Sequence, residues 1–327
     1  MTHNRVASRL SRTIDTALDR TVVPGFSRIG SAIRSRLPDR PHDPAADALV
    51  GCHVLVTGAT SGIGTAVAEQ LHTLGATVHL LVRDTGKGDL LATRLGDRAQ
   101  VWSCDLADFE SIRRCAKALC ESGITIDAIV HNAGVLPAER SETPQGHELT
   151  MGVHVLGPVL LTDLLADRLA VGARIVFVTS GGMYTQRLPV ADPEFRRGEY
   201  AGATAYARSK RTQVDLLAHF GARWPTAQVH AMHPGWVATP GVSASLPTFA
   251  KVMRPVLRTP GDGADTITWL IASTPPPVGG GLWHDRRRRP TTILPGTRST
   301  PAQRDRLWEW VCTATGLTTT AHPGLDT

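Results

Sequence analysis

The sequence predicts an α/β fold, in which helices cover both faces of a doubly wound parallel β-sheet, in a single domain with an N-terminal helical extension. Three observations support this prediction. Short apolar runs alternate with helical stretches from residue 52 onward, which is typical of a buried parallel sheet. A glycine-rich turn joins the first apolar run to the first helix. The chain has 327 residues, of which 42% are hydrophobic and 20% charged, so it can bury a full core without disulfides or metal.

Each apolar run is followed by a stretch with helical periodicity, so strands and helices are expected to alternate. The expected strands lie at residues 53–57, 77–82, 100–104, 126–130, 174–179 and 228–232. The expected helices lie at residues 62–74, 87–95, 109–120, 148–169, 204–220 and 264–271. Thr300 caps a further helix, with proline at its first position and glutamine at its third. These elements predict an extension with its linker (1–50), a main domain (51–316) and a frayed tail (317–327).

The N-terminal extension carries apolar side chains every four residues with arginines between them, which is the pattern of an amphipathic helix. The apolar positions are Val6, Leu10, Ile14 and Leu18. Pro24-Gly25 is expected to break this helix, and a second apolar pattern (Phe26, Ile29, Ile33, Leu37) precedes a proline-rich linker. Three interpretations stay open. Residues 1–37 lie on a membrane surface, or they pack on the protein's own domain, or they form a transit peptide, against which Asp15 and Asp19 count.

Composition and charge exclude several classes of protein. The net charge of +6 comes from 35 basic and 29 acidic residues, and the basic ones gather in residues 1–40 and in the run Arg286–Arg289. That pattern suits an anionic surface or phosphate groups, but no recognition motif accompanies it, so no nucleic acid is expected. The five cysteines form no Cys-x-x-Cys pair and the histidines have no ligand spacing, so no metal is expected. Without an export signal or a membrane-spanning run, the chain is expected to be cytoplasmic, with peripheral membrane contact left open.

A glycine loop follows the first strand and opens the first helix, where a dinucleotide pyrophosphate would bind. It reads Thr57-Gly58-Ala59-Thr60-Ser61-Gly62-Ile63-Gly64. Glycines let the backbone approach a phosphate, and the helix N-terminus offers free N–H donors. The alternative is an ordinary strand-to-helix turn.

Arg83 ends the second strand, nineteen residues past Gly64, where the side chain that reads the cofactor ribose is expected. A guanidinium fits a 2′-phosphate, whereas an acidic residue would accept a bond from a 2′-hydroxyl. Asp84 is expected to face the other way. The sequence therefore favours NADP over NAD, with a solvated arginine as the alternative.

Tyr206 has a lysine four residues later, Lys210, on the same face of an expected helix. The chain has only four lysines, so coincidence explains this spacing poorly. A nearby ammonium favours the phenolate and is expected to lower the pKa of Tyr206, which makes it a candidate general acid or base. Ser180 ends the preceding strand, at the sheet edge that faces the cofactor crevice. It is expected to bond a substrate oxygen, and its alternative is a turn residue.

From about residue 52 to 285 the chain resembles the short-chain dehydrogenase/reductase family. The matching motifs are the glycine loop, Asn132-Ala133-Gly134, Ser180, Tyr206-x-x-x-Lys210 and Pro234-Gly235-Trp236-Val237-Ala238-Thr239. Finer features resemble the retinol-dehydrogenase-like branch, and most closely the type of dehydrogenase/reductase SDR family member twelve. They are Arg83-Asp84, Ser180-Gly181-Gly182-Met183, His233-Pro234-Gly235-Trp236, Gly263-Ala264-Asp265-Thr266 and His284-Asp285-Arg286.

The resemblance implies a Rossmann-type sheet in the order 3-2-1-4-5-6-7 and hydride transfer at the nicotinamide C4, with Tyr206 as proton donor or acceptor. It also implies that Lys210 binds the nicotinamide ribose, that Asp105 approaches the adenine, and that Thr239 holds the carboxamide. The residues expected to bind the cofactor are Gly58, Thr60, Ser61, Gly62, Ile63, Gly64, Arg83, Asp105, Leu106, Asn132, Ala133, Gly134, Tyr206, Lys210, Pro234, Gly235, Val237 and Thr239.

The chain departs from the family pattern in two places. The interval between Ser180 and Tyr206 is about twice the usual length, and its insert, 186–200, is expected to be a surface loop near the site. The family also places an asparagine where His154 stands, to hold a water that passes protons to the lysine. His154 is therefore a candidate catalytic residue, and the alternative is a hydrogen-bonded core histidine.

An apolar segment at 240–257 is expected to be either a lid over an apolar alcohol or carbonyl substrate or ordinary helix packing. Its apolar residues are Val242, Leu246, Phe249, Val252, Met253, Val256 and Leu257. The leading hypothesis is an NADP-dependent oxidoreductase. The rivals are a non-catalytic dinucleotide sensor on the same fold and a protein whose extension and arginine run recruit it to a membrane. The sequence leaves open whether the protein is a homo-oligomer.

Overall fold

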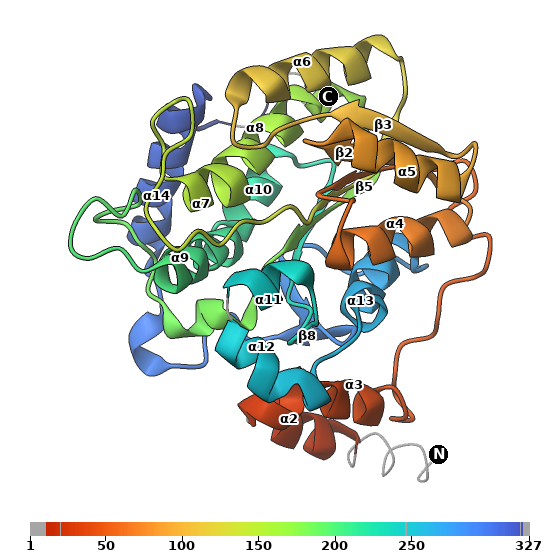
Figure 1. The fold of residues 1–327 in the computed structure, drawn as a ribbon, viewed down its shortest axis with the longest axis vertical. Coiled ribbons are helices and arrows are strands. Elements are labelled where there is room, and N and C mark those ends of the chain that lie inside the picture. The colour runs from red at the N-terminus through yellow and green to blue at the C-terminus, as the bar shows by residue number, and fades with distance from the viewer. Residues whose placement is uncertain (1–10, 20, 246, 321, 323–327) are drawn as a thin grey trace.

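The protein folds around one eight-stranded sheet with helices on both faces, as the computed structural model shows for residues 11–19, 21–245, 247–320 and 322 (Figure 1). The strand order is β3-β2-β1-β4-β5-β6-β7-β8. All neighbouring strands are parallel except β7 and β8, which are antiparallel. The predicted α/β fold of the Rossmann type is confirmed, and the sheet has one strand more than the resemblance implies.

The first six strands lie close to the expected positions, except that β5 begins at Leu169 rather than at residue 174, and the sequence predicts no range for β7 and β8. They are β1 His53–Thr57, β2 Thr77–Val82, β3 Ala99–Ser103, β4 Ile126–His131, β5 Leu169–Val178, β6 Gln228–Met232, β7 Gly281–His284 and β8 Arg287–Arg289. The main helices are α4 Gly62–Thr73, α5 Thr85–Leu95, α6 Phe109–Glu121, α8 Gly157–Leu164, α9 Gly202–Asp215, α10 Leu217–Arg223, α13 Pro260–Ala272 and α14 Pro301–Thr315. One buried apolar core lies between the sheet and α4, α5 and α13. The other lies between the sheet and α6, α8, α10 and α14.

The long helix expected at 148–169 is divided. It consists of α7 (Leu149–Met151), a π-helical turn (Gly152–Leu156), α8 and a 3-10 turn (Ala166–Arg168). β5 begins at Leu169 because that residue pairs with Ile126 of β4, and long-range pairing overrides the local helical pattern. The helix expected at 204–220 is similarly divided at Leu216 into α9 and α10.

Over residues 11–19 and 21–50, the N-terminal extension contains three helical segments, at 11–19, α2 (Val22–Phe26) and α3 (Arg28–Arg34). The expected break at Pro24-Gly25 is wrong, because both residues lie in α2. Proline is tolerated in the first turn of a helix, where its missing N–H would have no partner anyway. Leu18, Phe26 and Leu37 are buried against the domain, whereas Val6 and Leu10 lie outside the described residues.

The arginine run Arg286–Arg289, most of which forms β8, holds the extension and its linker in place. Arg286 pairs with Asp43 of the linker at 2.6 Å, Arg287 with Asp39 at 2.5 Å and Arg289 with Asp15 at 2.8 Å. The expectation that this run faces an anionic surface or phosphate is therefore wrong for these three arginines, because their charge is neutralised inside the molecule.

The C-terminal tail is held against the domain over its described part. Arg223 donates a hydrogen bond to the carbonyl of Thr318 at 3.3 Å, and the Trp308 indole donates to that of Thr319 at 3.4 Å. The expected fraying therefore does not include residues 317–320.

Candidate active site

The glycine loop forms a cradle between β1 and α4. Gly58 and Gly62 have positive φ angles of 65° and 54°, a backbone conformation that suits glycine. A Cβ on Gly64 would lie 2.2 Å from the Gly58 carbonyl oxygen, so only glycine lets the helix approach the loop this closely. The free N–H groups at the start of α4 then face the cleft, as a pyrophosphate requires. The residues present therefore fit a bound dinucleotide.

Asn132, directly after the neighbouring strand β4, fixes this cradle. Its side-chain nitrogen donates to the carbonyls of Thr57 at 3.0 Å and Gly58 at 3.2 Å. The Thr57 hydroxyl accepts bonds from the backbone N–H groups of Asn132 and Ala133, both at 3.0 Å. The motif Asn132-Ala133-Gly134 and the glycine loop are thus one hydrogen-bonded unit.

A cleft of about 850 Å³ opens at the carboxyl ends of the strands and gathers almost all of the predicted cofactor residues. The predicted residues that line it are Gly58, Thr60, Ser61, Gly62, Ile63, Arg83, Asp105, Leu106, Asn132, Ala133, Gly134, Ser180, Tyr206, Pro234, Gly235, Val237 and Thr239. Gly64, His154 and Lys210 lie behind this lining. The cleft lies where open α/β sheets bind their ligands.

Tyr206, Lys210 and Ser180 come together at the inner end of the cleft. Tyr206 is half-buried on α9 and shares a hydrogen bond with the Ser180 hydroxyl. The Lys210 ammonium donates to the Val178 carbonyl at 2.7 Å and lies 5.6 Å from the centre of the Tyr206 ring. The spacing of four residues on one helix therefore places both groups at one site, as the sequence predicts.

The pKa values differ from the expectation. Burial raises the pKa of Tyr206, and the hydrogen bond with Ser180 opposes that rise. Burial also lowers the pKa of Lys210 to about 7. The lowering of the tyrosine pKa by an ammonium is not found, because burial disfavours the charged forms of both groups. A lysine with a pKa near 7 can hold or release a proton at neutral pH.

The model of the short chain dehydrogenase family matches residues 52–248. The chain belongs to the short-chain dehydrogenase family. It is 34% identical over 266 residues to dehydrogenase/reductase SDR family member 12 of Bos taurus, covering 78% of this chain and 83% of that protein. It is 31% identical over 281 residues to human retinol dehydrogenase 12, covering 82% and 88% respectively. A solved structure from Escherichia coli CFT073, described as a short chain dehydrogenase complexed with NADPH, is 26% identical with a TM-score of 0.60, covering 75% of this chain and 100% of that one.

These similarities confirm the resemblance to the retinol-dehydrogenase-like branch. This short-chain dehydrogenase is an oxidoreductase that acts on CH–OH groups with a nicotinamide cofactor. Within the part of the chain that the structure describes, no helix is long and apolar enough to cross a membrane. No group of three His, Cys, Asp or Glu side chains among the described residues could hold a metal ion.

His154 lies in the π-helical turn of the dehydrogenase and is completely buried. Its Nε2 accepts a bond from the Val135 N–H at 2.9 Å, so Nδ1 carries the proton and donates to the Ser209 hydroxyl at 2.7 Å. The Ser209 hydroxyl in turn donates to the Tyr206 carbonyl at 2.8 Å. The histidine ring also packs edge-on against the Tyr206 ring, 5.3 Å between centroids. Both nitrogens are occupied, which favours the alternative of a hydrogen-bonded core residue over a proton relay.

The end of the cleft next to Arg83 contains a second cation, which the sequence analysis did not single out. Arg83 is exposed and lines the cleft, and so does Lys87. Asp84 also lines the cleft, contrary to expectation, but it caps α5 by accepting from the Lys87 N–H and pairs with the Lys87 ammonium at 3.3 Å. The sequence could have indicated Lys87 only through its position three residues after Asp84, which caps α5, because that spacing places the lysine in the first turn of the helix.

The apolar segment expected to be a lid or ordinary packing forms two short helices, α11 (Pro240–Ser245) and α12 (Pro247–Met253), which lie near α2 and α3 (Figure 1). Gly241, Ser245 and Phe249 of these helices line the cleft. The Phe249 ring meets the Trp236 ring edge-on at 5.3 Å, and both line the cleft. Val252 is exposed. Leu246 lies outside the described residues, and the Val242 side chain is likewise not described.

The insert at 186–200 is a loop, as expected, but its middle is anchored to the domain. Phe195 is buried under Arg208 of α9, whose guanidinium carbon lies 4.3 Å from the ring centre. Glu194 is also buried and accepts a bond from the Glu148 N–H at 2.6 Å. The insert therefore supports α7 and α9.

Proposed function

We propose that this dehydrogenase uses NADP(H) to transfer a hydride between the nicotinamide and an alcohol or carbonyl group of an apolar substrate. The observation that supports NADP is the pair of cations, Arg83 and Lys87, on the lining of the cleft where the cofactor ribose is expected. Asp84, a carboxylate beside them, is occupied by its cap bond and by Lys87. Because the charges of Asp84 and Lys87 cancel, the guanidinium of Arg83 gives this group a net positive charge, which favours a 2′-phosphate over a 2′-hydroxyl.

When bound, the nicotinamide supplies or accepts the hydride. The glycine cradle and Asn132 would hold its pyrophosphate and position it along the cleft, and Thr239 would contact the carboxamide. Ser180 would donate a hydrogen bond to the substrate oxygen. Tyr206 would give a proton to that oxygen during reduction or take it during oxidation, and Lys210, with its pKa of about 7, would restore the proton of the tyrosine.

An apolar substrate is supported by apolar side chains on the lining of the cleft. Val135, Leu136, Val153, Trp236 and Phe249 line the same cleft as Ser180 and Tyr206. Apolar walls with a few polar groups at the reacting end are typical of sites for apolar small molecules. Human retinol dehydrogenase 12, a relative by its sequence, is named for an alcohol of this kind. We therefore propose a lipid aldehyde, retinoid or steroid.

The test is an activity screen of apolar alcohols and aldehydes with both cofactors, followed by cofactor titrations of two variants. Arg83→Ala removes a charge-assisted bond to phosphate, worth about 1.5–3 kcal/mol, so the KM for NADPH should rise about 10- to 150-fold. The KM for NADH should change little. Arg94→Ala is the matched control, because Arg94 is an exposed arginine of α5 that pairs with Glu69 outside the cleft. Equal losses with both cofactors would remove the assignment to NADP.

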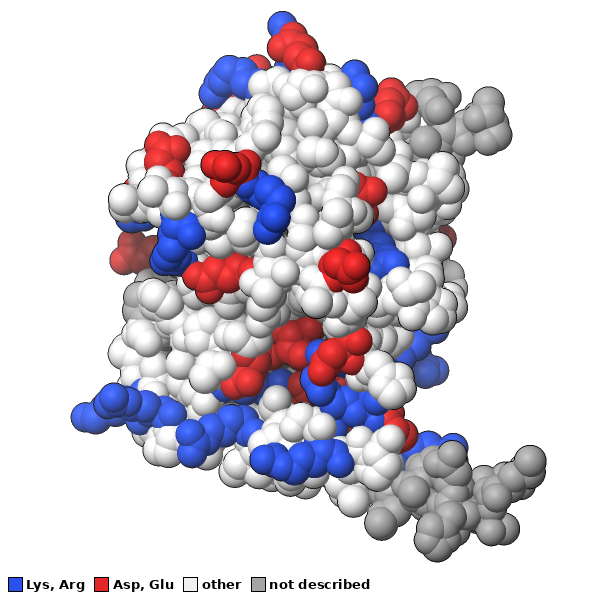
Figure 2. Space-filling model, turned by 90° about the vertical axis from the view of Figure 1, so that its right-hand side faces the viewer, with Lys and Arg blue, Asp and Glu red and all other residues white. Residues whose placement is uncertain are grey.

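Peripheral contact with an anionic membrane is a second proposal, which a specific surface supports. The apolar stripe expected to touch lipid is partly buried at Leu18, but α3 exposes Ile29 and Ile33. Val252 of α12 is exposed at the same end of the molecule, where Phe249 of α12 meets Trp236 and Trp236 meets Phe26 of α2. Figure 2 shows basic side chains gathered along this lower end, which Figure 1 assigns to α2 and α3. Neither α2, α3 nor α12 contains an acidic residue.

Vesicle flotation tests this contact. Burying an isoleucine in lipid is worth about 1.5–3 kcal/mol, so Ile33→Asp should weaken binding to phosphatidylglycerol vesicles at least about tenfold. Val171→Asp is the control, because Val171 is 91% exposed at the start of β5 and far from α3 in the fold. If Ile33→Asp floats like the wild type, if Val171→Asp weakens flotation as much as Ile33→Asp does, or if the protein does not float, the contact through α3 is excluded.

A further inference from the structure

The extension reaches the cofactor cleft through two backbone carbonyls of α2. The Phe26 carbonyl accepts bonds from the Trp236 N–H at 2.8 Å and from Arg258 Nε at 3.0 Å. The Gly25 carbonyl accepts bonds from Arg34 Nη1 at 2.8 Å and from Arg258 Nη2 at 3.1 Å. The loop 234–236, which lines the cleft, is thus bonded directly to a segment more than two hundred residues earlier in the chain.

The Phe26 side chain packs against the same loop, 234–236, and against its neighbours. Its ring meets the rings of His233 and Trp236 edge-on, with centroids 4.8 and 6.1 Å apart. It also lies against Gly181, where an added Cβ would come within 2.7 Å of the ring. Gly181 follows Ser180, so one buried side chain contacts both the loop 234–236 and the backbone beside the serine.

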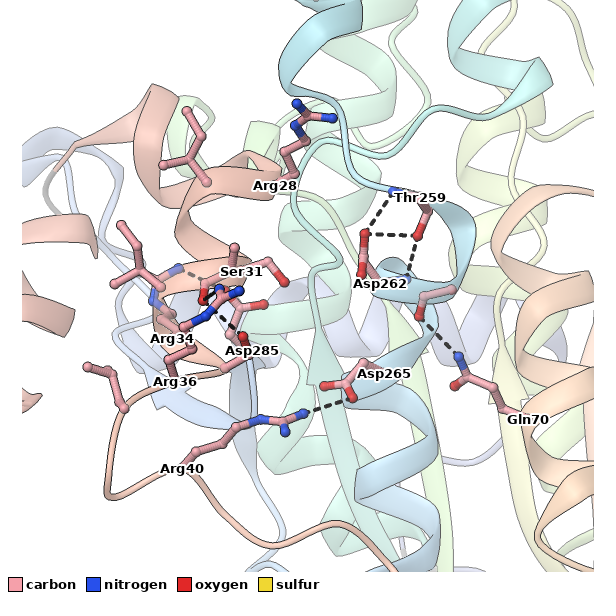
Figure 3. Close-up of a pocket in the computed structure, with 16 residues that line it drawn as sticks. Arg28, Ser31, Arg34, Arg36, Arg40, Gln70, Thr259, Asp262, Asp265 and Asp285 are labelled. Atoms are coloured by element: carbon pink, nitrogen blue, oxygen red, sulfur yellow. Dashed lines mark hydrogen bonds and ion pairs between the residues drawn. The ribbon is translucent and has the colours of Figure 1, made fainter.

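A buried ion network fixes the position of α2. Arg34 is 2% exposed and bonds Asp15 through Nε and Asp285 through Nη1, both at 2.8 Å. Asp285 also pairs with Arg258 at 2.5 Å. Figure 3 shows Arg34 and Asp285 meeting in the pocket between α3 and α13. Each carboxylate has a second arginine, so the network joins the extension to both β8 and the loop before α13.

The backbone of loop 234–236 is held between α2 on one side and Arg258 on the other, so its position depends on both. Gly235 has φ 77°, and an added Cβ would lie 2.5 Å from both Arg258 Nε and the Phe26 carbonyl oxygen. The Trp236 carbonyl accepts the Arg258 N–H at 2.8 Å. Without α2, the Trp236 N–H would lose its acceptor. The guanidinium of Arg258, which is 1% exposed, would lose the Gly25 and Phe26 carbonyls that accept its hydrogen bonds, and a buried charge without these partners is costly.

We infer that residues 21–37, the strap, are a positioning element of the active site: Phe26 and Arg34 hold the loop 234–236 in the conformation that binds the cofactor. This inference rests on the proposed assignment of that loop to the cofactor. It gives the extension a role in the reaction that does not depend on membrane contact.

The test compares Arg34→Met with Arg36→Met in the full-length protein. Arg36 lies two residues further along and is exposed, so its variant removes the same charge without touching the network. Arg34→Met should still fold, because Asp15 keeps Arg289 and Asp285 keeps Arg258. The first measurement is hydrogen exchange of a peptide that contains the Trp236 amide. The second is the dissociation constant of NADPH from fluorescence titration.

We expect Arg34→Met to speed exchange at Trp236 at least about tenfold and to weaken NADPH binding by a similar factor, with Arg36→Met like the wild type in both. Unchanged exchange would overturn the strap's role. Faster exchange with unchanged NADPH affinity would show that the loop does not serve the cofactor, which overturns the positioning inference together with that assignment. If Arg34→Met does not fold, Arg34→Lys replaces it, because an ammonium keeps the charge but cannot reach Asp15, Asp285 and Gly25 together. Partial rescue by lysine is then expected, and full wild-type exchange would again contradict the inference.

Discussion

Acid should unfold this dehydrogenase well above the pKa of its carboxylates, because it buries an unusual set of histidines. The buried histidines with a lowered pKa are His79, His131, His154, His230, His233 and His284. Burial is the main cause in each case, and it lowers the pKa to about 4 for His79 and His230 and to about 3 for His131 and His284.

The lowered pKa values determine how stability changes with pH. Below the unfolded pKa of about 6.5, the unfolded chain binds protons that the folded protein does not, so the free energy of unfolding decreases as the pH is lowered. Each such histidine costs about 1.4 kcal/mol at pH 5.5, so the set costs about 8 kcal/mol there. Because a typical domain has only about 5–15 kcal/mol of stability, unfolding is expected near pH 5. The aspartates with lowered pKa values, such as Asp15 and Asp39, lose their contribution only below about pH 4.

Denaturant unfolding followed by tryptophan fluorescence between pH 7.5 and 4.5 measures this slope. His230 provides the sharpest variant, because it is fully buried and neither ring nitrogen has a hydrogen-bond partner. His230→Leu should therefore reduce the slope below pH 6.5 by about one proton, or about 1.4 kcal/mol per pH unit. His42→Leu, at an exposed position, is the control. A free energy of unfolding that is constant from pH 7 to 5 would refute the reasoning.

The other predictions concern the site directly. Tyr206→Phe should lower turnover at least about 10²-fold while NADPH binding survives, and near-normal turnover in a steady-state assay would contradict the acid–base role. His154→Leu should leave the Val135 N–H without an acceptor, at about 1–3 kcal/mol of stability, and should lower turnover without moving the acid limb of the rate profile. If the acid limb of the pH–rate profile shifts between the wild type and His154→Asn or His154→Leu, the result would instead support a role of His154 in proton transfer. Gly64→Ala should weaken NADPH binding at least about tenfold in a titration, because its Cβ would meet the Gly58 carbonyl at 2.2 Å, whereas Gly221→Ala, with open space around it, should not.

The parts of the fold that the sequence predicts are those set by local pattern. The strands from β1 to β6 are apolar runs between helices with a clear period, so their type and their approximate positions could be predicted, whereas their order in the sheet was implied by the family resemblance. The glycine loop and the pair Tyr206–Lys210 could be found for the same reason, since their spacing within one element fixes their geometry. The structure brings these residues into one cleft.

The parts that the sequence does not predict depend on contacts between distant segments. β7 is four residues long and has no strand signal of its own, so only the family resemblance implied it, and β8, which consists of three arginines, was not expected at all. The π-helical turn at His154 has no periodicity of its own. Phe26 fits a helical apolar pattern, but the pattern cannot show that its carbonyl bonds Trp236 across the molecule. Arg287 and Arg289 could not be recognised as internal, because the aspartates that neutralise them lie in the extension.

α3 makes the two roles of the extension separable, because its inner and outer faces differ. Gly30 and Arg34 face the domain, whereas Ile29 and Ile33, each one position earlier, are 46% and 38% exposed. Deleting the extension would remove both faces at once, and a truncated protein that failed to bind vesicles or NADPH would not show which face mattered. Single substitutions avoid this ambiguity. Ile33→Asp should alter vesicle binding but not exchange at Trp236, and Arg34→Met should do the reverse. If the two variants changed both measurements together, the faces would act as one unit, and neither the membrane contact nor the strap could be assigned to its own side chains.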